Sequence, residues 1–181
     1  VEKFVVTGAS KRGWTTWLTA SVDPRVVAIA PIVIDVLNVD VSMQHHFASY
    51  GFWAPAIDDY VHHKIMERRG SQNYPKLLQL VDPFAYRDRL QMPKCVINAT
   101  GDQFFCPDSS QFYFDQLPGE NHLCYVPNSE HSLKETNALD SLIAFHYSVV
   151  HQVERPKLEW EHHAAGHWTL RCRDLAPGHS L

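Results

Sequence analysis

The chain has 181 residues, of which 45% are hydrophobic and 20% charged, a composition typical of a globular protein. Its 16 basic and 20 acidic residues give a formal net charge of −4, and no basic run is longer than Arg68-Arg69. This charge pattern excludes the usual basic kind of nucleic-acid-binding protein. The longest apolar stretch, residues 26–37, is interrupted by Pro31 and Asp35 and is shorter than the about 20 residues of a membrane helix, so no membrane span is expected.

The start of the chain and its cysteines bear on where the protein works. Residues 1–6 contain neither an initiator methionine nor the charged start and apolar middle of a signal peptide, so we expect the chain to be a fragment. The four cysteines, Cys95, Cys106, Cys124 and Cys172, lack the spacing of a metal finger or a disulfide framework. We expect free thiols, with one Cys106–Cys124 bridge in an exported protein as the open alternative.

Residues 1–37 predict a strand, a tight turn, a helix and a second strand. A β-rich run at 3–7 ends at the turn that contains Ser10, and the apolar spacing at 11–21 indicates a helix. The nearly continuous apolar run at 25–36 is typical of a strand buried on both faces of a parallel sheet.

Residues 38–90 predict a helical cap inserted over the edge of the sheet. The segment is aromatic and polar, with helical stretches expected near 42–48 and 57–69. Its aromatic residues could line a substrate pocket, but we expect them to form the core of the cap itself. They are Phe47, Tyr50, Phe52 and Trp53.

Beyond the insertion, strands are expected at 94–99 and 122–126, with helices at 107–117 and 133–150. Strands that alternate with helices predict an α/β fold with a parallel sheet flanked by helices, here residues 1–155. The remaining residues, 156–181, change to short alternating runs. They predict the opening hairpin of a small, truncated β domain.

Three residues that can carry acyl transfer follow predicted strands. Ser10, Asp102 and His131 each come directly after one, and parallel sheets place functional residues at the carboxyl ends of their strands. A serine hydroxyl needs a base within hydrogen-bond reach and a carboxylate that holds the base in the correct tautomer. The chain order Ser, Asp, His is that of α/β-hydrolases. We therefore predict Ser10 as nucleophile, His131 as general base and Asp102 as the acid that orients it.

Each of these assignments has an alternative. Ser10 could cap a helix, Asp102 could be an Asx-turn residue after a glycine, and His131 could be an ordinary loop histidine, one of twelve in the chain. Asp35, at the end of the preceding strand, is the main competitor for the role of the acid. Asp108 is a weaker competitor, because a helix N-terminus attracts a carboxylate without any catalytic role.

The turn at the predicted nucleophile departs from the usual G-x-S-x-G pattern. Gly8 and Ala9 provide the small residues that a sharp strand-to-helix turn needs before the serine, but Arg12 stands where the second glycine is usual, and Gly13 follows one residue later. The N-terminus of the helix would direct the Lys11 amide at a developing oxyanion. Lys11 is therefore predicted to contribute one donor of the oxyanion hole.

The sequence indicates no cofactor and no metal. The histidine pairs lack the H-E-x-x-H spacing of a zinc hydrolase, although His63 and Glu67 are one helical turn apart. We expect these pairs to lie on solvated faces of helices. They are His45-His46, His62-His63 and His162-His163.

Three long strings resemble one protein family. They are V-T-G-A-S-K-R-G-W-T-T-W-L at 6–18, P-I-V-I-D-V-L-N at 31–38 and N-A-T-G-D-Q-F-F-C-P-D-S-S at 98–110. They resemble the PhoPQ-activated pathogenicity-related proteins, a branch of the α/β-hydrolases, and the resemblance extends to about Trp160. It implies a periplasmic or extracellular protein with a peptidase-like hydrolase core, of which this chain is the C-terminal half, and with Ser10, Asp102 and His131 as the triad.

The leading hypothesis is a serine hydrolase that cleaves a peptide or ester bond. The early strands are not in this chain, and neither is the loop that normally supplies the second oxyanion donor, so we expect the fragment alone to lack that donor. The rival is a non-catalytic secreted binding or signalling protein on the same scaffold, which the Arg12 departure favours. Metal-dependent hydrolysis has little support, and the sequence leaves the oligomeric state open.

Overall fold

The structure, a computed structural model, describes residues 2–164 and 166–173 of the chain. It divides into two compact units, Val1–Leu142 and Ile143–Leu181. This division lies within the last helix, earlier than the boundary near residue 155 that the composition predicts. Residues 174–181 of the predicted β domain lie outside the described part.

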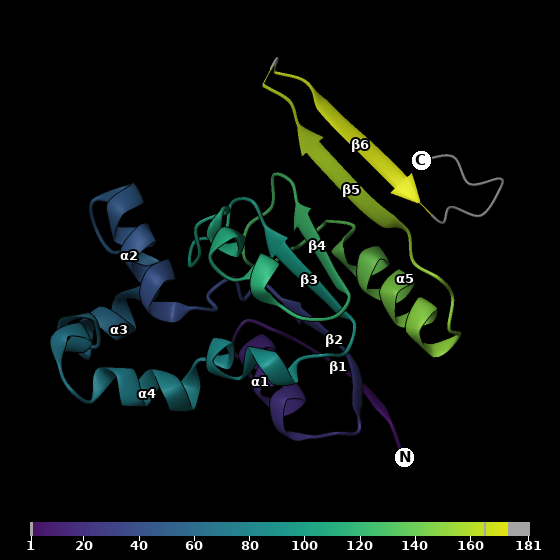
Figure 1. Ribbon diagram of the computed structural model, residues 1–181. Helices are drawn as coiled ribbons and strands as arrows, with labels where there is room; N and C mark the ends of the chain where they lie inside the picture. Colours follow the sequence, from purple (N-terminus) through teal and green to yellow (C-terminus); the bar gives the residue numbers. More distant parts are fainter. Residues whose placement is uncertain (1, 165, 174–181) are drawn as a thin grey trace. The chain divides into compact units, whose positions relative to one another are not determined.

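A four-stranded parallel sheet forms the centre of the first unit (Figure 1). Its strands are hydrogen-bonded in chain order: β1 (Phe4–Ala9), β2 (Val26–Ile32), β3 (Lys94–Ala99) and β4 (Asn121–Val126). Ala9 pairs with Ile32 and Ala99 pairs with Val126, so the carboxyl ends of all four strands lie at one edge. The predicted parallel α/β fold is confirmed.

The two central strands are the most deeply buried. β3 is buried at every residue, although it begins with a lysine. The Lys94 ammonium is fully buried and donates to the carbonyls of Leu90, Met92 and Pro118, each at 2.7 Å. Burial lowers the pKa of Lys94 to about 8. A buried ammonium needs partners for its protons, so this side chain joins three carbonyls near the amino end of β3.

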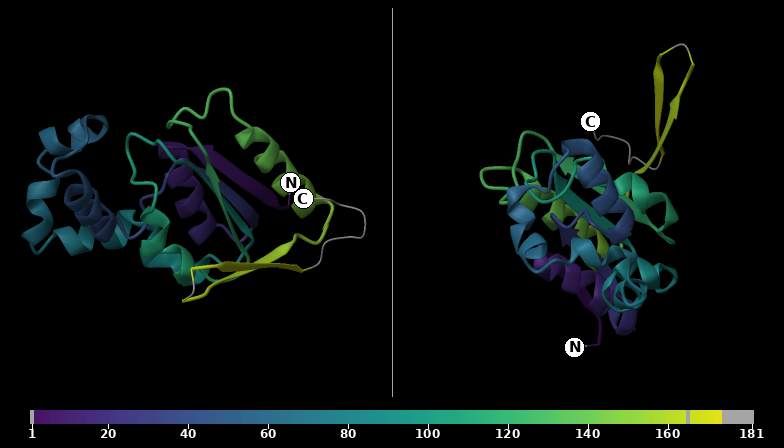
Figure 2. Two further views of the ribbon diagram at one scale, coloured as in Figure 1. Left: turned by 90° about the horizontal axis from the view of Figure 1, so that it is seen from above. Right: turned by 90° about the vertical axis from the view of Figure 1, so that its left-hand side faces the viewer.

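Helix α1 (Lys11–Val22) packs on one face of the sheet, against β1 and β2 (Figure 2). Its buried residues recur every three or four positions, as expected for an amphipathic helix. Trp17 is fully buried in the core, and the Trp14 indole N–H donates to the Val81 carbonyl at 2.6 Å. The helix therefore fixes the position of the turn that precedes it.

The predicted insertion is helical. It contains α2 (Val39–Tyr50), α3 (Asp58–His62) and α4 (Tyr74–Val81), joined by the 3₁₀ helices η1 (Pro55–Ile57), η2 (Met66–Gly70) and η3 (Pro83–Arg89). Asp82 ties its two ends together, because one carboxylate oxygen accepts from the Val39 N–H at 2.8 Å and the other from the Phe84 N–H at 2.9 Å. α2 also contacts η4 (Ser109–Phe112), a 3₁₀ helix that follows β3.

Three predicted elements differ from the structure for identifiable reasons. The strand expected at 25–36 ends at Ile32, because Val33 adopts a positive φ of 44°. The helix expected at 107–117 is replaced by η4 and η5 (Phe114–Gln116), since Tyr113 between them leaves the helical region at φ −147°. The last helix, α5 (Ala138–Val150), begins five residues late, after positive φ angles at Leu133 and Glu135.

The second unit contains the end of α5 and an antiparallel hairpin. β5 (Lys157–His162) pairs with β6 (Trp168–Arg173), which confirms the predicted hairpin. Cys106 and Cys124 are separate thiols, so the alternative of a bridge between them is not realised. Among the described residues, no helix combines the length and apolarity needed to cross a membrane.

Candidate active site

Ser10 occupies a strained turn between β1 and α1. Its backbone has φ 56° and ψ −124°, a region that side-chain-bearing residues rarely adopt. Its N–H donates to the Ile32 carbonyl at 2.9 Å, and its carbonyl accepts from the Trp14 N–H at 3.0 Å, so both backbone groups are fixed. The residue stands at the N-cap position, but its hydroxyl makes no capping hydrogen bond. The hydroxyl is therefore not used to satisfy the helix.

The displaced glycine has a steric explanation. A Cβ at Gly13 would lie 2.8 Å from Ile34 Cγ2 and 2.9 Å from the Gly8 carbonyl oxygen, so this position packs directly against the sheet. A Cβ at Gly8 would lie 2.8 Å from the Arg12 Cβ. The turn thus makes room for Arg12 by lacking a side chain at Gly8. In this turn, Gly8 and Gly13 allow the close packing that the second glycine of G-x-S-x-G usually allows, so the turn stays sharp although Arg12 replaces that glycine.

His131 and Asp102 contact each other at the same edge of the sheet. His131 Nδ1 lies 2.8 Å from Asp102 Oδ2, and the side chains are 17% and 3% exposed. The other oxygen of Asp102 accepts from the Phe104 N–H at 2.8 Å. The carboxylate therefore has a fixed orientation, and the ring is bound through Nδ1, which leaves Nε2 for a reacting group.

The loops that carry this pair are joined by backbone contacts. The Gly101 N–H donates to the Ser129 carbonyl at 2.8 Å, and a Cβ at Gly101 would lie 2.9 Å from that oxygen. The His131 N–H donates to the Gln103 side-chain oxygen at 3.0 Å, and the Gln103 amide donates to Glu130 at 3.2 Å. Sequence reasoning missed Gln103 and Glu130, although both stand beside predicted site residues.

In the structure the predicted base, His131, contacts the predicted acid, Asp102. The contact expected between Ser10 and His131 is not formed. Between described residues, no hydrogen bond joins the Ser10 hydroxyl to the His131 ring. Contacts of this kind are often long in unliganded enzymes and tighten when substrate binds. The roles of Ser10, His131 and Asp102 stay predictions, and so does that of Lys11, the first residue of α1, where helix N–H groups lack intrahelical partners.

Asp35, the main competitor for the acid, has different partners. It is 2% exposed and accepts hydrogen bonds from the hydroxyls of Tyr113, at 2.7 Å, and Tyr125. Burial raises its pKa from 3.8 to about 6, against the opposing effect of the two hydroxyls, and the negative charges of Asp102 and Asp108 add to the rise. Neither of its oxygens has a hydrogen bond to His131, so it does not orient the predicted base.

The third candidate acid, Asp108, contacts the insertion. Its two carboxylate oxygens lie 2.8 and 3.0 Å from His45 Nε2 on α2. The neighbouring His46 is only 1% exposed, and its Nε2 accepts from the Ala54 N–H at 3.1 Å. The expectation of a solvated face is therefore wrong for His46, because it lies on the inner face of α2. His62 and His63 are exposed as expected, and the side chain of His162 lies outside the described part.

Aromatic rings surround part of the site. The Phe104 ring centroid lies 4.4 Å from that of His131, and the Phe105 centroid lies 6.1 Å away. Of the aromatic cluster in the insertion, Phe47 is 45% and Phe52 57% exposed, with Phe47 and Trp53 centroids 5.0 Å apart. The prediction that this cluster forms the core of the cap is wrong for Phe47, Tyr50 and Phe52, whose rings remain open to solvent, whereas Trp53 is partly buried against the core.

Comparison with known proteins identifies a relative in the slime mould Dictyostelium discoideum. The chain is 43% identical over 164 residues to the protein described as "Autocrine proliferation repressor protein A", covering 88% of this chain and 33% of that relative. The chain thus spans about a third of the length of its curated relative.

Solved structures share the fold at low sequence identity. Acetyl xylan esterase 1 from Thermoanaerobacterium sp. JW/SL YS485 matches with a TM-score of 0.58 and 15% identity, over 82% of this chain and 45% of that chain. The acylaminoacyl peptidase of Pyrococcus horikoshii matches with a TM-score of 0.59 and 15% identity, over 85% of this chain and 25% of that chain. These likenesses establish an α/β-hydrolase fold.

A match to a protein family covers more of this chain than either of the two structural matches. Residues 1–174 match the family described as "PhoPQ-activated pathogenicity-related protein". Because this match includes both the sheet with its strand-end loops and the β5–β6 hairpin, the chain belongs to the PhoPQ-activated pathogenicity-related protein family.

Proposed function

We propose that this chain carries the catalytic half of a serine hydrolase that cleaves a peptide or ester bond. The observation that carries the proposal is the strained Ser10 turn at the sheet edge where Asp102 binds His131 Nδ1. A backbone held in this costly conformation, with its hydroxyl not used for capping, is the arrangement that a nucleophile requires. The fold neighbours include both an esterase and a peptidase, so either bond type agrees with the scaffold.

In the proposed reaction, Ser10 Oγ attacks the substrate carbonyl while His131 Nε2 takes the hydroxyl proton. Asp102 holds the ring in the tautomer with its proton on Nδ1 and stabilises the imidazolium that forms. The Lys11 amide, at the N-terminus of α1, donates to the oxyanion. His131 then gives its proton to the leaving amine or alcohol, and water repeats the sequence on the acyl-enzyme. We extend the proposal to an exported protein, as the family resemblance implies.

A fluorophosphonate probe tests this function on the intact protein. We expect labelling of the wild type and loss of labelling in Ser10→Ala. Ser71→Ala, at an exposed serine in the insertion, is the matched control and should label like the wild type. An intact, folded wild-type protein that resists the probe at high concentration contradicts the proposal.

A second function is favoured by the name of the Dictyostelium relative, which describes a proliferation repressor. In this alternative the chain is part of a secreted signalling or binding protein that keeps the hydrolase scaffold without its chemistry. A Ser10→Ala protein that retains full signalling activity on cells, together with a wild type that does not label, supports it. Loss of signalling in Ser10→Ala would instead link the signal to hydrolysis.

A further inference from the structure

A cluster of three potential metal ligands joins the insertion to the loop after β3. His45 lies on α2, whereas Cys106 and Asp108 lie on the loop between β3 and η4. The ligand atoms of these three side chains all lie within 4.8 Å of one another. Among the side chains that the structure describes, this is the one group of three or more such residues close enough to hold an ion.

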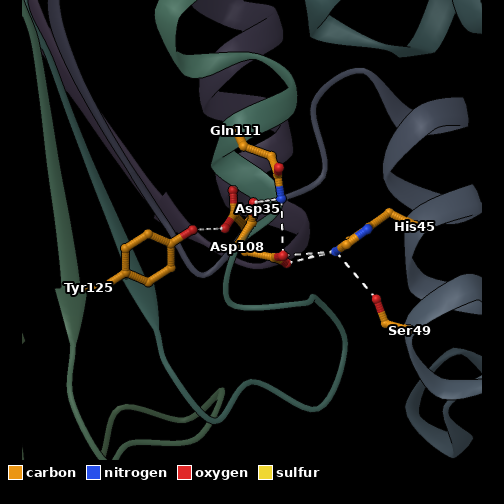
Figure 3. A network of polar contacts seen from close by, with 6 residues as sticks. All are labelled: Asp35, His45, Ser49, Asp108, Gln111 and Tyr125. Atoms are coloured by element: carbon orange, nitrogen blue, oxygen red, sulfur yellow. Dashed lines mark hydrogen bonds and ion pairs between the residues drawn. The ribbon is translucent and has the colours of Figure 1, made fainter. Parts of the chain in front are cut away.

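Surrounding residues hold two of the three ligands in place (Figure 3). The His45 ring packs edge-on against Phe112, with centroids 4.9 Å apart. The Ser49 hydroxyl lies 3.3 Å from His45 Nε2. The Gln111 amide donates to Asp108 Oδ2 at 3.0 Å. The Phe112 ring and the Gln111 amide contact the ligands in the way that groups behind the ligands of metal sites do. The Ser49 hydroxyl contacts Nε2 itself, and an ion bound there would take its place. The imidazole and the carboxylate already point at each other.

The three ligands differ in solvent exposure, which rises from the thiol through the imidazole to the carboxylate. Cys106 is 3% exposed, whereas the side chains of His45 and Asp108 are 27% and 54% exposed. An ion bound here would therefore have its thiolate ligand inside the protein and its carboxylate ligand at the surface, with access for water. The cluster is built from two separate elements, so an ion would also connect them.

We propose that His45 Nε2, Cys106 Sγ and one carboxylate oxygen of Asp108 bind a divalent transition metal, with zinc the best match. One imidazole, one thiolate and one carboxylate form a donor set that suits zinc, and water completes a tetrahedral site. Hard ions such as magnesium and calcium prefer sites made of oxygen ligands alone. On binding, the thiol releases its proton to solvent, and the metal replaces any proton on His45 Nε2.

The metal fixes α2 of the insertion to the loop that begins with Asp102. That loop also carries Phe104, which contacts the His131 ring. Zinc binding is therefore expected to stabilise the insertion against the sheet edge. This role is separate from the proposed hydrolysis and stands whether or not Ser10 is a nucleophile.

Metal titration of the chelator-treated intact protein tests the site. We expect one zinc per chain by competition with a chromophoric chelator, and a higher melting temperature with zinc present. Cobalt in place of zinc is expected to show a thiolate-to-metal charge-transfer band. Cys106→Ala, His45→Ala and Asp108→Asn should each weaken binding by at least about 100-fold, since even groups behind the ligands contribute 10- to 100-fold.

Matched controls separate this site from chance binding elsewhere. Cys124→Ala and His62→Ala remove a thiol and an exposed histidine outside the cluster and should bind zinc like the wild type. Asp108 is half exposed, so Asp108→Asn is expected to fold even if the Cys106 variant does not. Absence of stoichiometric binding, a cobalt complex without the charge-transfer band, or undiminished binding in Asp108→Asn would each overturn the proposal.

Discussion

Two aspartates follow neighbouring strands of the sheet and have opposite environments. Asp35 comes after β2 and Asp102 after β3. Counted as whole residues, they are only 2% and 9% exposed. Asp102 binds the His131 ring and a backbone N–H, whereas Asp35 binds two tyrosine hydroxyls. A histidine can take a proton and, as the imidazolium, stabilise the carboxylate. A tyrosine hydroxyl can only donate a hydrogen bond to the carboxylate and takes up no proton near neutral pH.

The difference shows that position after a strand does not by itself bring a carboxylate to a histidine. Both sites satisfy the geometry of a strand-end carboxylate, but only one includes a group that can move a proton. The buried Asp35 is better described as a structural anchor that joins η4, η5 and β4 through Tyr113 and Tyr125. Burial makes the ionisation of Asp35 costly and raises its pKa, although its two tyrosine partners favour the ionised form.

The largest expected contrast is in catalysis. Asp102→Asn should lower the hydrolytic kcat by about 10⁴-fold, because the amide favours the wrong His131 tautomer. Asp35→Asn, the matched substitution one strand away, should change kcat by no more than about threefold, because Asp35 does not contact the ring. Both are measured by steady-state kinetics once a substrate is found, or by fluorophosphonate labelling rates. Equal losses in the two variants would show that the choice of Asp102 is wrong.

The second contrast is in the pH dependence of stability. The pKa of Asp35 rises from 3.8 to about 6 on folding, so between these values the folded protein holds a proton that the unfolded chain has released. The free energy of unfolding therefore falls as pH rises, by about 2 kcal/mol for this group between pH 4 and 7. Denaturant titrations with chelator present should show this fall in the wild type relative to Asp35→Asn. A constant difference between the two proteins across this pH range would contradict the raised pKa.

Much of this contrast could not have been predicted from the sequence. Strand ends, the order Ser, Asp, His and the G-D-Q-F string were enough to choose Asp102 with His131, but the same reasoning kept Asp35 as a competitor. Its partners distinguish it from Asp102, and these partners, Tyr113 and Tyr125, lie 78 and 90 residues further along the chain. Tyr113 was also placed in a predicted helix, which the structure breaks at that residue to bring the hydroxyl to Asp35.

The insertion was even less predictable. Its helical content was evident, but the contact between His45 and Asp108 joins residues 63 positions apart, and no local pattern indicates it. Exposed aromatic rings were assigned to a core because hydrophobicity alone does not reveal which face of a short helix packs inward. The residues that position His131 were missed for a similar reason, since glutamine carries no chemical signature of its own.

A smaller effect is expected from the tyrosine that contacts Asp35. Tyr125→Phe removes one donor and leaves a buried carboxylate oxygen without it, which should lower the free energy of unfolding by about 2 kcal/mol at pH 7. The loss should shrink near pH 4, where Asp35 is protonated. Tyr86→Phe, which removes a solvent-exposed hydrogen bond to the Gln79 carbonyl, is the control and should change stability by no more than about 0.5 kcal/mol. Equal losses at both pH values would argue against an ionised Asp35.

The smallest expected effect concerns Gln103, which supports the Asp102–His131 pair from outside. Its side-chain oxygen accepts from the His131 N–H at 3.0 Å, so Gln103→Ala frees the backbone of the base without removing any reacting group. A hydrogen bond of this kind contributes about 1 kcal/mol, which corresponds to a fall in kcat of about fivefold with KM and melting temperature nearly unchanged. Gln111→Ala, which removes the amide that contacts Asp108, should leave kcat as it is. If Gln103→Ala lowers the melting temperature and leaves kcat intact, then Gln103 stabilises the loop and does not position His131 for catalysis.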